Sequence, residues 1–243
     1  MRIRPVGAHA LLLDCTAPAD TPEAVADVPE AALVEAWRAE LWRRRERGDL
    51  IAVEIVPAAR TVLLDGLPDP TTTAEQLTRW AAAVTAATTR SNQADAHADA
   101  DAQDQDHNAT AEDEADDAAG VLVPVTFDGP DLPAVAEHWG VDVPAVRHRL
   151  TSTRFRVAFC GFAPGFPYLT GLPAELALPR LATPRPRVPA GSVALAGPYA
   201  GIYPGASPGG WLLVGRTDLV LFDVAADPPT RLGPGTTVRM VAA

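Results

Sequence analysis

Proline and glycine are concentrated in one part of this 243-residue chain, which limits what that part can fold into. Between Cys160 and Gly210 there are ten prolines and nine glycines. Proline removes a backbone hydrogen-bond donor and glycine loses conformational entropy in a regular element, so a long helix is excluded there. The stretch nevertheless keeps large apolar residues that need a surface to pack on: Phe162, Phe166, Tyr168, Leu169, Tyr199, Tyr203 and Trp211. We therefore expect short strands and rigid loops, and rigid loops often carry binding sites.

The densest part of this region is Gly161–Pro173, GFAPGFPYLTGLP, with three glycines, three prolines and three aromatic residues. Such a mixture predicts a rigid loop and not a helix or a central strand. We expect this loop to form a wall of the site, with Pro164, Gly165, Phe166 and Tyr168 facing a ligand or a partner protein. The alternative is that the loop only stiffens the rim of the domain.

Residues 121–243 have the pattern of a compact β-barrel or sandwich. A strand is expected at 121–127 and another at 154–162, with two helices between them, the second opened by Pro144. Short apolar runs separated by proline and glycine follow at 192–197, 201–205, 211–217, 219–224 and 236–243. Regularly spaced short strands with this punctuation are typical of a barrel or a sandwich.

The N-terminal residues 1–84 have a different order of elements. We expect one strand over Ile3–Asp14, a helix over 22–47, two strands within 50–66 and a helix over Thr72–Val84. Strand, helix, two strands, helix is the order of a split β-α-β unit, in which helices cover one face of a sheet. The sequence therefore predicts an α+β protein with a small N-terminal domain over 1–84 and a β domain over 121–243.

Residues 85–120 separate the two predicted domains and carry most of the acidity. Their net charge is −9, out of −11 for the whole chain, and they contain no aromatic residue and no aliphatic residue larger than alanine. A segment of this composition has little to bury, so we predict a disordered acidic insertion. Asp and His alternate in it, and an acidic metal-binding tract is the alternative. Because nothing fixes a coordination geometry, we expect no metal site.

The scarce residue types exclude several functions. Cys15 and Cys160 are the only cysteines, so there is no disulfide framework and no CxxC pair. All twenty basic residues are arginine, which excludes a Schiff-base lysine, a P-loop lysine and a biotinylated lysine. An anion would have to be held by arginine or by backbone N–H groups. Because neither a signal-peptide layout nor a long apolar run is found, we expect a cytoplasmic protein.

One stretch matches a catalytic motif literally. Gly205–Gly209 has the G-x-S-x-G pattern of a serine-hydrolase nucleophile elbow, with Ser207 at its centre. The elbow needs an N–H group on the residue after the serine and a helix beyond it. Here that residue is Pro208, which has no N–H, and an apolar run follows at Trp211. We reject the hydrolase interpretation and expect a β-turn at Ser207–Gly210.

A second group of residues is typical of an anion site. Three arginines lie in a proline-stiffened segment, where a fixed backbone lowers the entropic cost of gripping an anion: Arg180, Arg185 and Arg187. Solvent-exposed loop arginines are the alternative. The backbone at Gly191 and Ser192 predicts either an anion nest or a turn. Arg216 follows an apolar run, and we expect it to be drawn inward to pair with a carboxylate.

Four consecutive blocks resemble the family of the 5-oxoprolinase B subunit, also described as allophanate hydrolase subunit 1 or the kinase A inhibitor type. The blocks are FCGFAPGFPYLTGLP, PRLATPRPRVPAGSVALAG, GIYPGASPGGWLLVGRT and LFD…DPPTRLGPGTTVRM. The resemblance covers residues 121–240 strongly, and residues 1–84 in layout only. It implies a cyclophilin-like β-barrel as the C-terminal domain. The acidic insertion is not part of the family's pattern.

The resemblance also implies a function. The chain would be one component of an ATP-dependent 5-oxoprolinase, which opens 5-oxo-L-proline to L-glutamate, together with a homologous C subunit and an A subunit of that enzyme. Mg-ATP would be shared with a partner protein of the complex. The catalytic residues are not identified by it, but the blocks supply candidates for substrate or interface contacts: Pro164, Gly165, Phe166, Tyr168, Arg187, Gly191, Ser192, Tyr203, Ser207, Gly210 and Arg216.

Two other functions remain open within the same resemblance. One is a carboxyltransferase-type component of a urea or allophanate system, which would need a biotin carboxylase partner. The other is a non-catalytic inhibitor of a sensor histidine kinase. The residues do not separate these three possibilities, whereas the neighbouring genes would.

Overall fold

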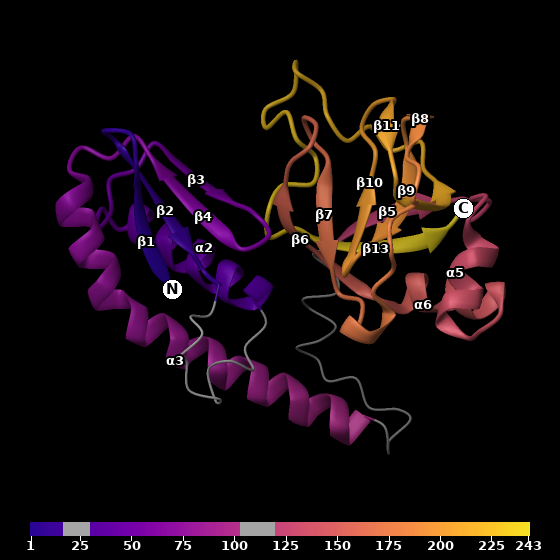
Figure 1. Ribbon diagram of the computed structural model, residues 1–243, viewed down its shortest axis with the longest axis horizontal. Coiled ribbons are helices and arrows are strands. Elements are labelled where there is room, and N and C mark those ends of the chain that lie inside the picture. Colours follow the sequence, from indigo (N-terminus) through magenta and orange to yellow (C-terminus); the bar gives the residue numbers. More distant parts are fainter. Residues whose placement is uncertain (17–29, 103–119) are drawn as a thin grey trace. The chain divides into compact units, whose positions relative to one another are not determined.

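The computed structural model describes residues 1–16, 30–102 and 120–243, with side chains in all of these ranges except 91–102. The chain forms two compact units, Met1–Thr110 and Ala111–Ala243, each with its own hydrophobic core (Figure 1). Among the helices in the described ranges, none combines the length and the hydropathy that a membrane span requires.

The first unit is a four-stranded antiparallel sheet with two helices. Its elements are β1 (Arg2–Val6), β2 (Ala10–Asp14), α2 (Glu30–Glu46), β3 (Glu54–Pro57), β4 (Thr61–Asp65) and α3 (Pro70–Ala102). The strand order is β1-β2-β4-β3, so β2 and β3 run parallel, are joined through α2 and have β4 between them. This is the predicted split β-α-β arrangement. The first part of the helix predicted over 22–47 lies outside the described residues.

The core of the first unit explains why α2 and the sheet pair. Val34, Trp37 and Leu41 recur at helical spacing and are buried on α2, and Leu11 and Leu13 alternate on the covered face of β2. One stripe of the helix therefore meets one face of the sheet, which is the simplest way for both to bury their apolar sides.

Two elements of the first unit differ from the expectation. The strand expected over Ile3–Asp14 is a hairpin of β1 and β2, because the chain reverses at Gly7, where φ is +61°. Helix α3 continues past Val84 to Ala102, into the segment for which we predict disorder. Alanine is the strongest helix former, and alanine-rich sequence continues the helix without a core to bury. Residues 103–119 lie outside the described ranges, so the predicted domain limits at 84 and 120 stay predictions.

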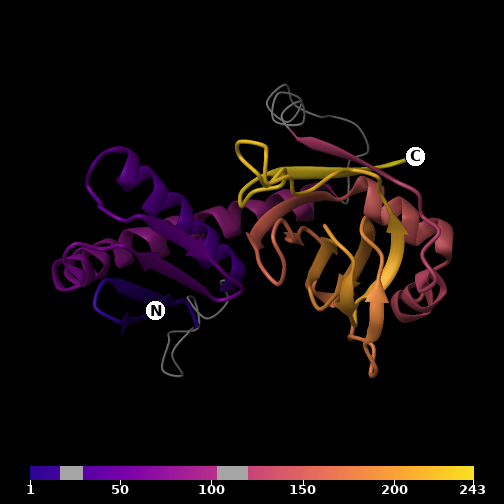
Figure 2. The same cartoon turned by 90° about the horizontal axis from the view of Figure 1, so that it is seen from above.

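The second unit is a seven-stranded, nearly closed barrel with two helices. It contains β5 (Val121–Val125), α5 (Leu132–Trp139), α6 (Val143–Ser152), β6 (Arg154–Cys160), β7 (Pro167–Thr170), η1 (Ala174–Leu176), β8 (Arg185–Val188), β9 (Ser192–Ala196), β10 (Tyr199–Ile202), β11 (Ser207–Gly209), β12 (Leu212–Arg216) and β13 (Thr237–Ala242). The main sheet has the order β12-β9-β10-β7-β6-β13-β5, and β8 pairs with β11 in a separate ribbon. The strands of the main sheet curve round toward each other in Figure 2. The mixed α/β class with a barrel is thus confirmed.

A single β-bridge links the two edge strands of the main sheet, β5 and β12, so that the barrel is nearly closed. Thr126, just after β5, and Arg216, at the end of β12, exchange two backbone hydrogen bonds of 2.9 Å. Of the strand pairs in the main sheet, that of β13 and β5 is parallel. The interior is filled by aliphatic residues from all seven strands of the main sheet and by the inner faces of α5 and α6, including Val135 and Leu150. A closed sheet removes the exposed edges that invite aggregation.

Three details of the second unit overturn the sequence-based expectation. Pro167–Thr170, inside the predicted loop, is β7, a central strand, because Pro167 is its first residue and needs no ladder donor there. Ser207–Gly209 is the short strand β11 and not a turn. The strand expected at 219–224 is reduced to a single bridge between Phe222 and Thr230.

Candidate functional site

One side of the barrel wall carries a layer of aromatic side chains. Residues of β9 alternate between two cores: Val193 and Leu195 belong to the barrel interior, whereas Ala194 and Ala196 belong to a second core. The small residues leave room for rings on that side. At Gly201 of β10, an added Cβ would lie 2.9 Å from atoms of two rings. We call the rings packed there the aromatic cluster: Phe162, Phe166, Tyr168, Tyr203 and Trp211.

Phe166 is the centre of the aromatic cluster. Its ring centroid lies 5.1 Å from those of Tyr168 and Tyr203, and 5.4 Å from those of Phe162 and Trp211. Most of these pairs meet edge to face, the arrangement that the quadrupoles of aromatic rings favour. Phe166 is only 1% exposed. The ring of Phe166 is the core around which the others pack, and the prediction that it faces a ligand stays a prediction.

A tight turn sets the outer edge of the aromatic cluster. Gly161 N–H donates to the Phe166 carbonyl oxygen at 3.2 Å, and Phe166 N–H donates to the Ala163 carbonyl oxygen at 3.0 Å. Phe162, inside this turn, has a φ of 69°, an uncommon conformation for a non-glycine residue, and its side chain is 64% exposed. Strained positions of this kind gather at functional sites. Phe162 was not singled out from the sequence, because a positive φ arises from the folded turn.

The neighbours of Phe162 in this turn differ in exposure. Pro164 is exposed, whereas Gly165 is buried against the loop that follows β12, and an added Cβ there would lie 2.7 Å from Cβ of Phe222. Gly165 is therefore a packing residue. Tyr168 is partly buried, and its ring stacks on Phe159 with centroids 4.3 Å apart. Of the four residues predicted to face a ligand, only Pro164 and Tyr168 have accessible surface.

The three arginines of the proline-rich segment have different surroundings. Arg185 is used structurally: its guanidinium donates to Asp131 Oδ1 at 2.7 Å and to the Trp211 carbonyl at 3.3 Å. Arg187 is exposed on β8. Arg180 is exposed as well, and its Cζ lies 6.0 Å from the centroid of the Trp211 ring. Arg180 is thus the arginine placed beside the aromatic cluster, although Arg187 was the predicted site residue.

Gly191 and Ser192 form a turn and not an anion nest. Gly191 N–H donates to the Tyr203 carbonyl at 2.7 Å, and Ser192 N–H donates to the Pro189 carbonyl at 3.4 Å. Because the two donors already have protein partners, they do not point at a free anion. The Gly191 carbonyl also accepts from Thr217 N–H at 2.9 Å, so this turn joins β9, β10 and the end of β12.

The β11 residues border the aromatic cluster. At Gly209, an added Cβ would lie 2.3 Å from the Tyr203 hydroxyl oxygen, so Tyr203 points at this backbone. The carbonyl of Gly210 accepts from Leu181 N–H at 2.7 Å. The Oγ atom of Ser207 is enclosed and has no hydrogen-bond partner among the described residues. Tyr203, Ser207 and Gly210 are thus in one neighbourhood, as expected, but Tyr203 is 2% exposed and lies in the core.

Arg216 is separate from the aromatic cluster. Its guanidinium Nε donates to Asp128 Oδ2 at 2.8 Å, and both side chains are largely exposed. The expected pairing with a carboxylate is present, but it lies on the surface and not inside. Arg216 lines a small pocket of about 230 Å³ with residues on either side of the barrel closure, Thr126 and Thr217 among them.

The two phenols of the aromatic cluster remain protonated at neutral pH. Burial raises the pKa of Tyr168 and of Tyr203 above the ordinary value, and the positive charge of Arg180 opposes this shift in both. The placement of Arg180 Cζ 6.0 Å from the centroid of Trp211 is consistent with this effect. The accessible groups of the site are the exposed ring of Phe162, part of Tyr168 with its phenol, and the guanidinium of Arg180.

Neither cysteine is reactive near neutral pH. Burial raises the pKa of Cys15 to about 12 and that of Cys160 to about 11, so neither supplies a thiolate near neutral pH. We expect iodoacetamide to alkylate the folded protein at pH 8 at least about 100-fold more slowly than the urea-unfolded chain. In the unfolded chain both thiols have a pKa near 9, whereas in the folded protein the pKa is about 12 for Cys15 and about 11 for Cys160. The folded protein should therefore lose stability as the pH rises above about 9, where only the unfolded chain ionises its thiols. Equal alkylation rates for the folded and the urea-unfolded protein would contradict the expected protection of the two thiols.

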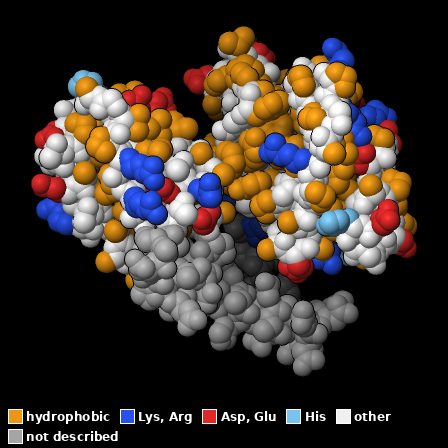
Figure 3. All heavy atoms as spheres, viewed as in Figure 1, with side chains coloured by type: hydrophobic (Ala, Val, Ile, Leu, Met, Phe, Trp, Pro, Cys, Tyr) orange, Lys and Arg blue, Asp and Glu red, His pale blue; other side chains and the backbone are white. Residues whose placement is uncertain are grey.

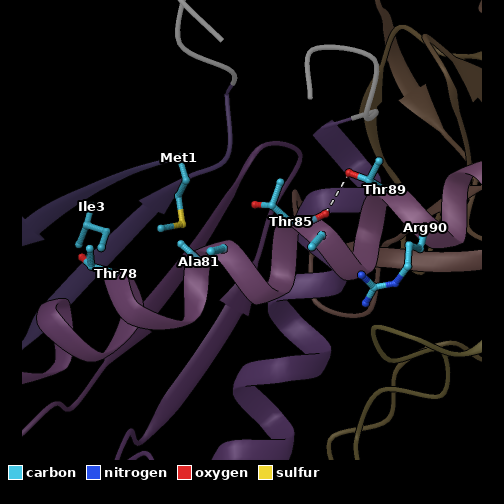
Figure 4. Close-up of a pocket in the computed structure, with 9 residues that line it drawn as sticks. Met1, Ile3, Thr78, Ala81, Thr85, Thr89 and Arg90 are labelled. Carbon is cyan, nitrogen blue, oxygen red and sulfur yellow. Dashed lines mark hydrogen bonds between the residues drawn. The ribbon is translucent and has the colours of Figure 1, made fainter. Parts of the chain in front are cut away.

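The first unit has a hollow of about 810 Å³ between β1 and α3 (Figure 4). Met1 and Ile3 line one side of it, and small residues of α3 line the other. The hydroxyls of Thr78 and Thr89 already donate to carbonyls within the helix, at 2.8 and 3.0 Å. Arg90 is the one charged side chain of the lining, and the others are apolar residues and threonines. We therefore take the site at the aromatic cluster as the better candidate.

Figure 3 shows the exposed side of this candidate site, where hydrophobic side chains gather over β7 and β10 with a basic side chain among them. The structure brings Tyr168, Tyr203 and Trp211 together with Arg180, and it leaves Arg216 elsewhere. Within the described ranges, no three His, Cys, Asp or Glu side chains are grouped so that they would hold a metal ion.

The chain matches one protein family over most of its length. Residues 1–232 fit the family model described as "Carboxyltransferase domain, subdomain C and D". A curated relative, the B subunit of 5-oxoprolinase from Escherichia coli O157:H7, is 51% identical over 124 residues. That match covers 50% of this chain and 57% of the relative, so the chain spans little more than half the length of this relative.

Solved structures share the fold of the whole chain. The crystal structure of TTHA0988 covers 100% of this chain with a TM-score of 0.63 and 30% identity, and the match takes up 40% of that protein. Urea carboxylase of Kluyveromyces lactis covers 99% of this chain with a TM-score of 0.54, and the match takes up 21% of that enzyme. At 19% identity, this second likeness shows the fold alone.

Proposed function

Because the chain belongs to the family of the carboxyltransferase domain, subdomain C and D, we propose that it is one component of a heteromeric, ATP-dependent 5-oxoprolinase. The complex would cleave 5-oxo-L-proline to L-glutamate with hydrolysis of ATP. The observation that carries this proposal is the 51% identity to a protein named as the B subunit of 5-oxoprolinase. The site at the aromatic cluster supports it through the exposed Arg180, which is suited to an anionic substrate.

The chemistry of the substrate explains what such a site has to provide. 5-Oxoproline is a five-membered lactam, and its amide is stable in water, so ATP would supply a phosphoryl group that makes the amide oxygen a leaving group. Water then adds to the activated carbon, phosphate leaves and the ring C–N bond opens to give the amine of L-glutamate. The protein's own contribution is to bind and orient the ring for this step. Tyr168, which is partly buried, offers an apolar surface for this purpose, and its protonated phenol is a donor.

The described residues fit only part of an ATP site. Arginine is the one basic side chain of the sequence, apart from histidine, and suits phosphate groups through its bidentate donors. No described group of carboxylates or histidines suits Mg²⁺. We therefore propose that Mg-ATP is held together with a partner protein of the complex.

Exposed apolar residues near the site would meet that partner. Phe162 is 64% exposed, and Val220 and Val224, in the loop that follows β12, are 66% and 85% exposed. Phe222 of the same loop packs against Gly165 in the turn of Phe162, so the loop and the turn form one rim. Large apolar residues on a rim are typical of protein interfaces. We propose that this rim docks the homologous C subunit, with the A subunit completing the enzyme.

The proposed function is tested by reconstitution. The purified chain alone should release negligible ADP in response to 5-oxo-L-proline, and adding the C and A subunits of 5-oxoprolinase should restore substrate-dependent release. Complexes without 5-oxo-L-proline provide the control for background ATP hydrolysis. Strong turnover by the isolated chain would contradict the need for partners, and no turnover by the complete complex would contradict the function.

A second function has a specific observation in its favour. The whole chain shares its fold with part of a urea carboxylase, and a carboxyltransferase-type component of a urea-converting enzyme would fit that likeness. The same assay separates the two proposals. Urea-dependent ADP release with a biotin carboxylase partner, and none with 5-oxo-L-proline, would favour the urea system.

A further inference from the structure

Arg180 is an exposed cation beside the aromatic cluster, in which Trp211 is 5% exposed and Tyr168 is partly buried. Its Cζ lies 6.0 Å from the centroid of Trp211, and its charge acts on the phenols of both Tyr168 and Tyr203. A guanidinium is weakly hydrated and tolerates the face of a ring better than an ammonium group does. A ligand that carries a negative charge next to a flat ring would therefore find both complements at one place.

The backbone around Arg180 is fixed on both sides. Leu178 and Gly197 exchange two backbone hydrogen bonds of 3.1 and 2.6 Å, and Leu181 N–H donates to the Gly210 carbonyl at 2.7 Å. Pro179 restricts φ between these attachments. Leu178 is 3% exposed and packs in the barrel core. The base of the Arg180 side chain is therefore anchored before any ligand arrives, which lowers the entropic cost of binding.

Arg180 also keeps its charge available. Arg185, five residues on, is neutralised by Asp131 at 2.7 Å, and Arg216 is neutralised by Asp128 at 2.8 Å. Within the described part of the chain, no carboxylate lies within ion-pair distance of Arg180. The groups on which its charge acts there are rings of the aromatic cluster. An exposed cation that the fold anchors but does not pair is suited to an anionic ligand.

We propose that Arg180 binds the carboxylate of the substrate while the substrate ring lies against the accessible part of Tyr168. The ligand class is a small, flat carboxylic acid, such as a five-membered lactam with a carboxylate on the ring. This assignment rests on the proposed function, because it takes 5-oxo-L-proline as the substrate. The site then distinguishes 5-oxo-L-proline from neutral amides, since only the acid forms the charged hydrogen bonds.

The test uses the reconstituted complex and two ligands. 5-Oxo-L-proline is the substrate, and 2-pyrrolidinone, which has the same ring without the carboxylate, is the competitor. Arg180→Gln should raise KM for 5-oxo-L-proline by about 50-fold, the typical loss for a charged hydrogen bond, with a smaller effect on kcat. The inhibition constant of 2-pyrrolidinone should stay within about twofold, because the ring contacts remain.

Two further variants sharpen the result. Arg180→Lys keeps the charge but loses the two-pronged geometry, so its KM should lie between those of the wild type and Arg180→Gln. Arg147→Gln, which removes an exposed arginine on α6, is the matched control and should behave as the wild type. A KM for Arg180→Gln within about twofold of wild type would overturn the proposal. So would an equal rise in KM and in the inhibition constant, since that would indicate a structural role.

Failure of the proposed function is distinguished from failure of this subsite. If the wild-type complex turns over 5-oxo-L-proline and Arg180→Gln does so with unchanged KM, the function stands and the subsite is wrong. If the complex is inactive, 5-oxo-L-proline is titrated into the isolated chain and followed by ligand-observed NMR. Binding that Arg180→Gln abolishes would support the subsite, and absence of binding to the wild type would overturn it.

Discussion

Replacing Gly191 by alanine is expected to destabilise the second unit by about 3 kcal/mol, which corresponds to a fall in Tm of about 10 °C. Gly191 has a φ of +77°, and an added Cβ would lie 2.1 Å from the carbonyl oxygen of Thr217. That atom belongs to the backbone and cannot rotate away. The turn would have to open, with loss of the hydrogen bonds to Tyr203 and Thr217 that join three strands.

Gly197→Ala provides the matched control. Gly197 also has a positive φ, +55°, but no atom lies within 4 Å of an added Cβ. This variant carries the conformational strain alone, which costs about 1 kcal/mol. Differential scanning calorimetry of both variants measures the comparison. If Gly191→Ala were no less stable than Gly197→Ala, the close contact with Thr217 would not govern this turn.

Asp131→Ala is the second change expected to have a large effect, with a loss of about 3 kcal/mol. The Asp131 carboxylate accepts from the Arg185 guanidinium at 2.7 Å and from the Leu213 N–H at 2.6 Å. Its side chain is only 12% exposed. Without the Asp131 carboxylate, the Leu213 N–H and the Arg185 guanidinium lose their acceptor. The substitution also removes the link between Arg185 of β8 and Leu213 of β12. Urea denaturation followed by circular dichroism measures the loss.

The Asp128–Arg216 pair is the control for this prediction. Its N–O distance, 2.8 Å, is close to that of Asp131–Arg185, but both partners are largely exposed. Exposed ion pairs contribute little, so Asp128→Ala should leave the denaturation midpoint nearly unchanged. If the two aspartate variants lost the same stability, burial would not be what distinguishes these pairs.

Much of the fold was readable because its strands carry simple patterns. The barrel strands β9 and β12 are apolar runs bounded by glycine, and α2 shows helical spacing of Val34, Trp37 and Leu41. The central strand β7 was missed, because proline and glycine dominate its surroundings and only the pairing with β6 and β10 makes it regular. The helix beyond Val84 was missed because its composition was judged by burial and not by the helix propensity of alanine.

The sequence indicated which segments of the chain form the candidate site, but not which of their side chains are exposed. The density of proline, glycine and aromatic residues indicated the loops in which the structure places the aromatic cluster, since such residues serve little purpose in a flexible linker. Which ring is buried depends on tertiary packing: Phe166 and Phe162 stand four residues apart in one motif, yet one is 1% and the other 64% exposed. The same holds for arginine, because only the fold shows that Asp131 neutralises Arg185 and leaves Arg180 unpaired with any described carboxylate.

The position of β13 has a consequence for the order in which the barrel assembles during synthesis. β13 is the last strand of the main sheet in the chain, yet it lies between β5 and β6 and joins them. Until residues 237–242 have left the ribosome, β5 and β6 each present an unpaired edge, which is the form in which nascent chains aggregate. A message truncated before Thr237 would therefore yield a product that chaperones hold or proteases remove.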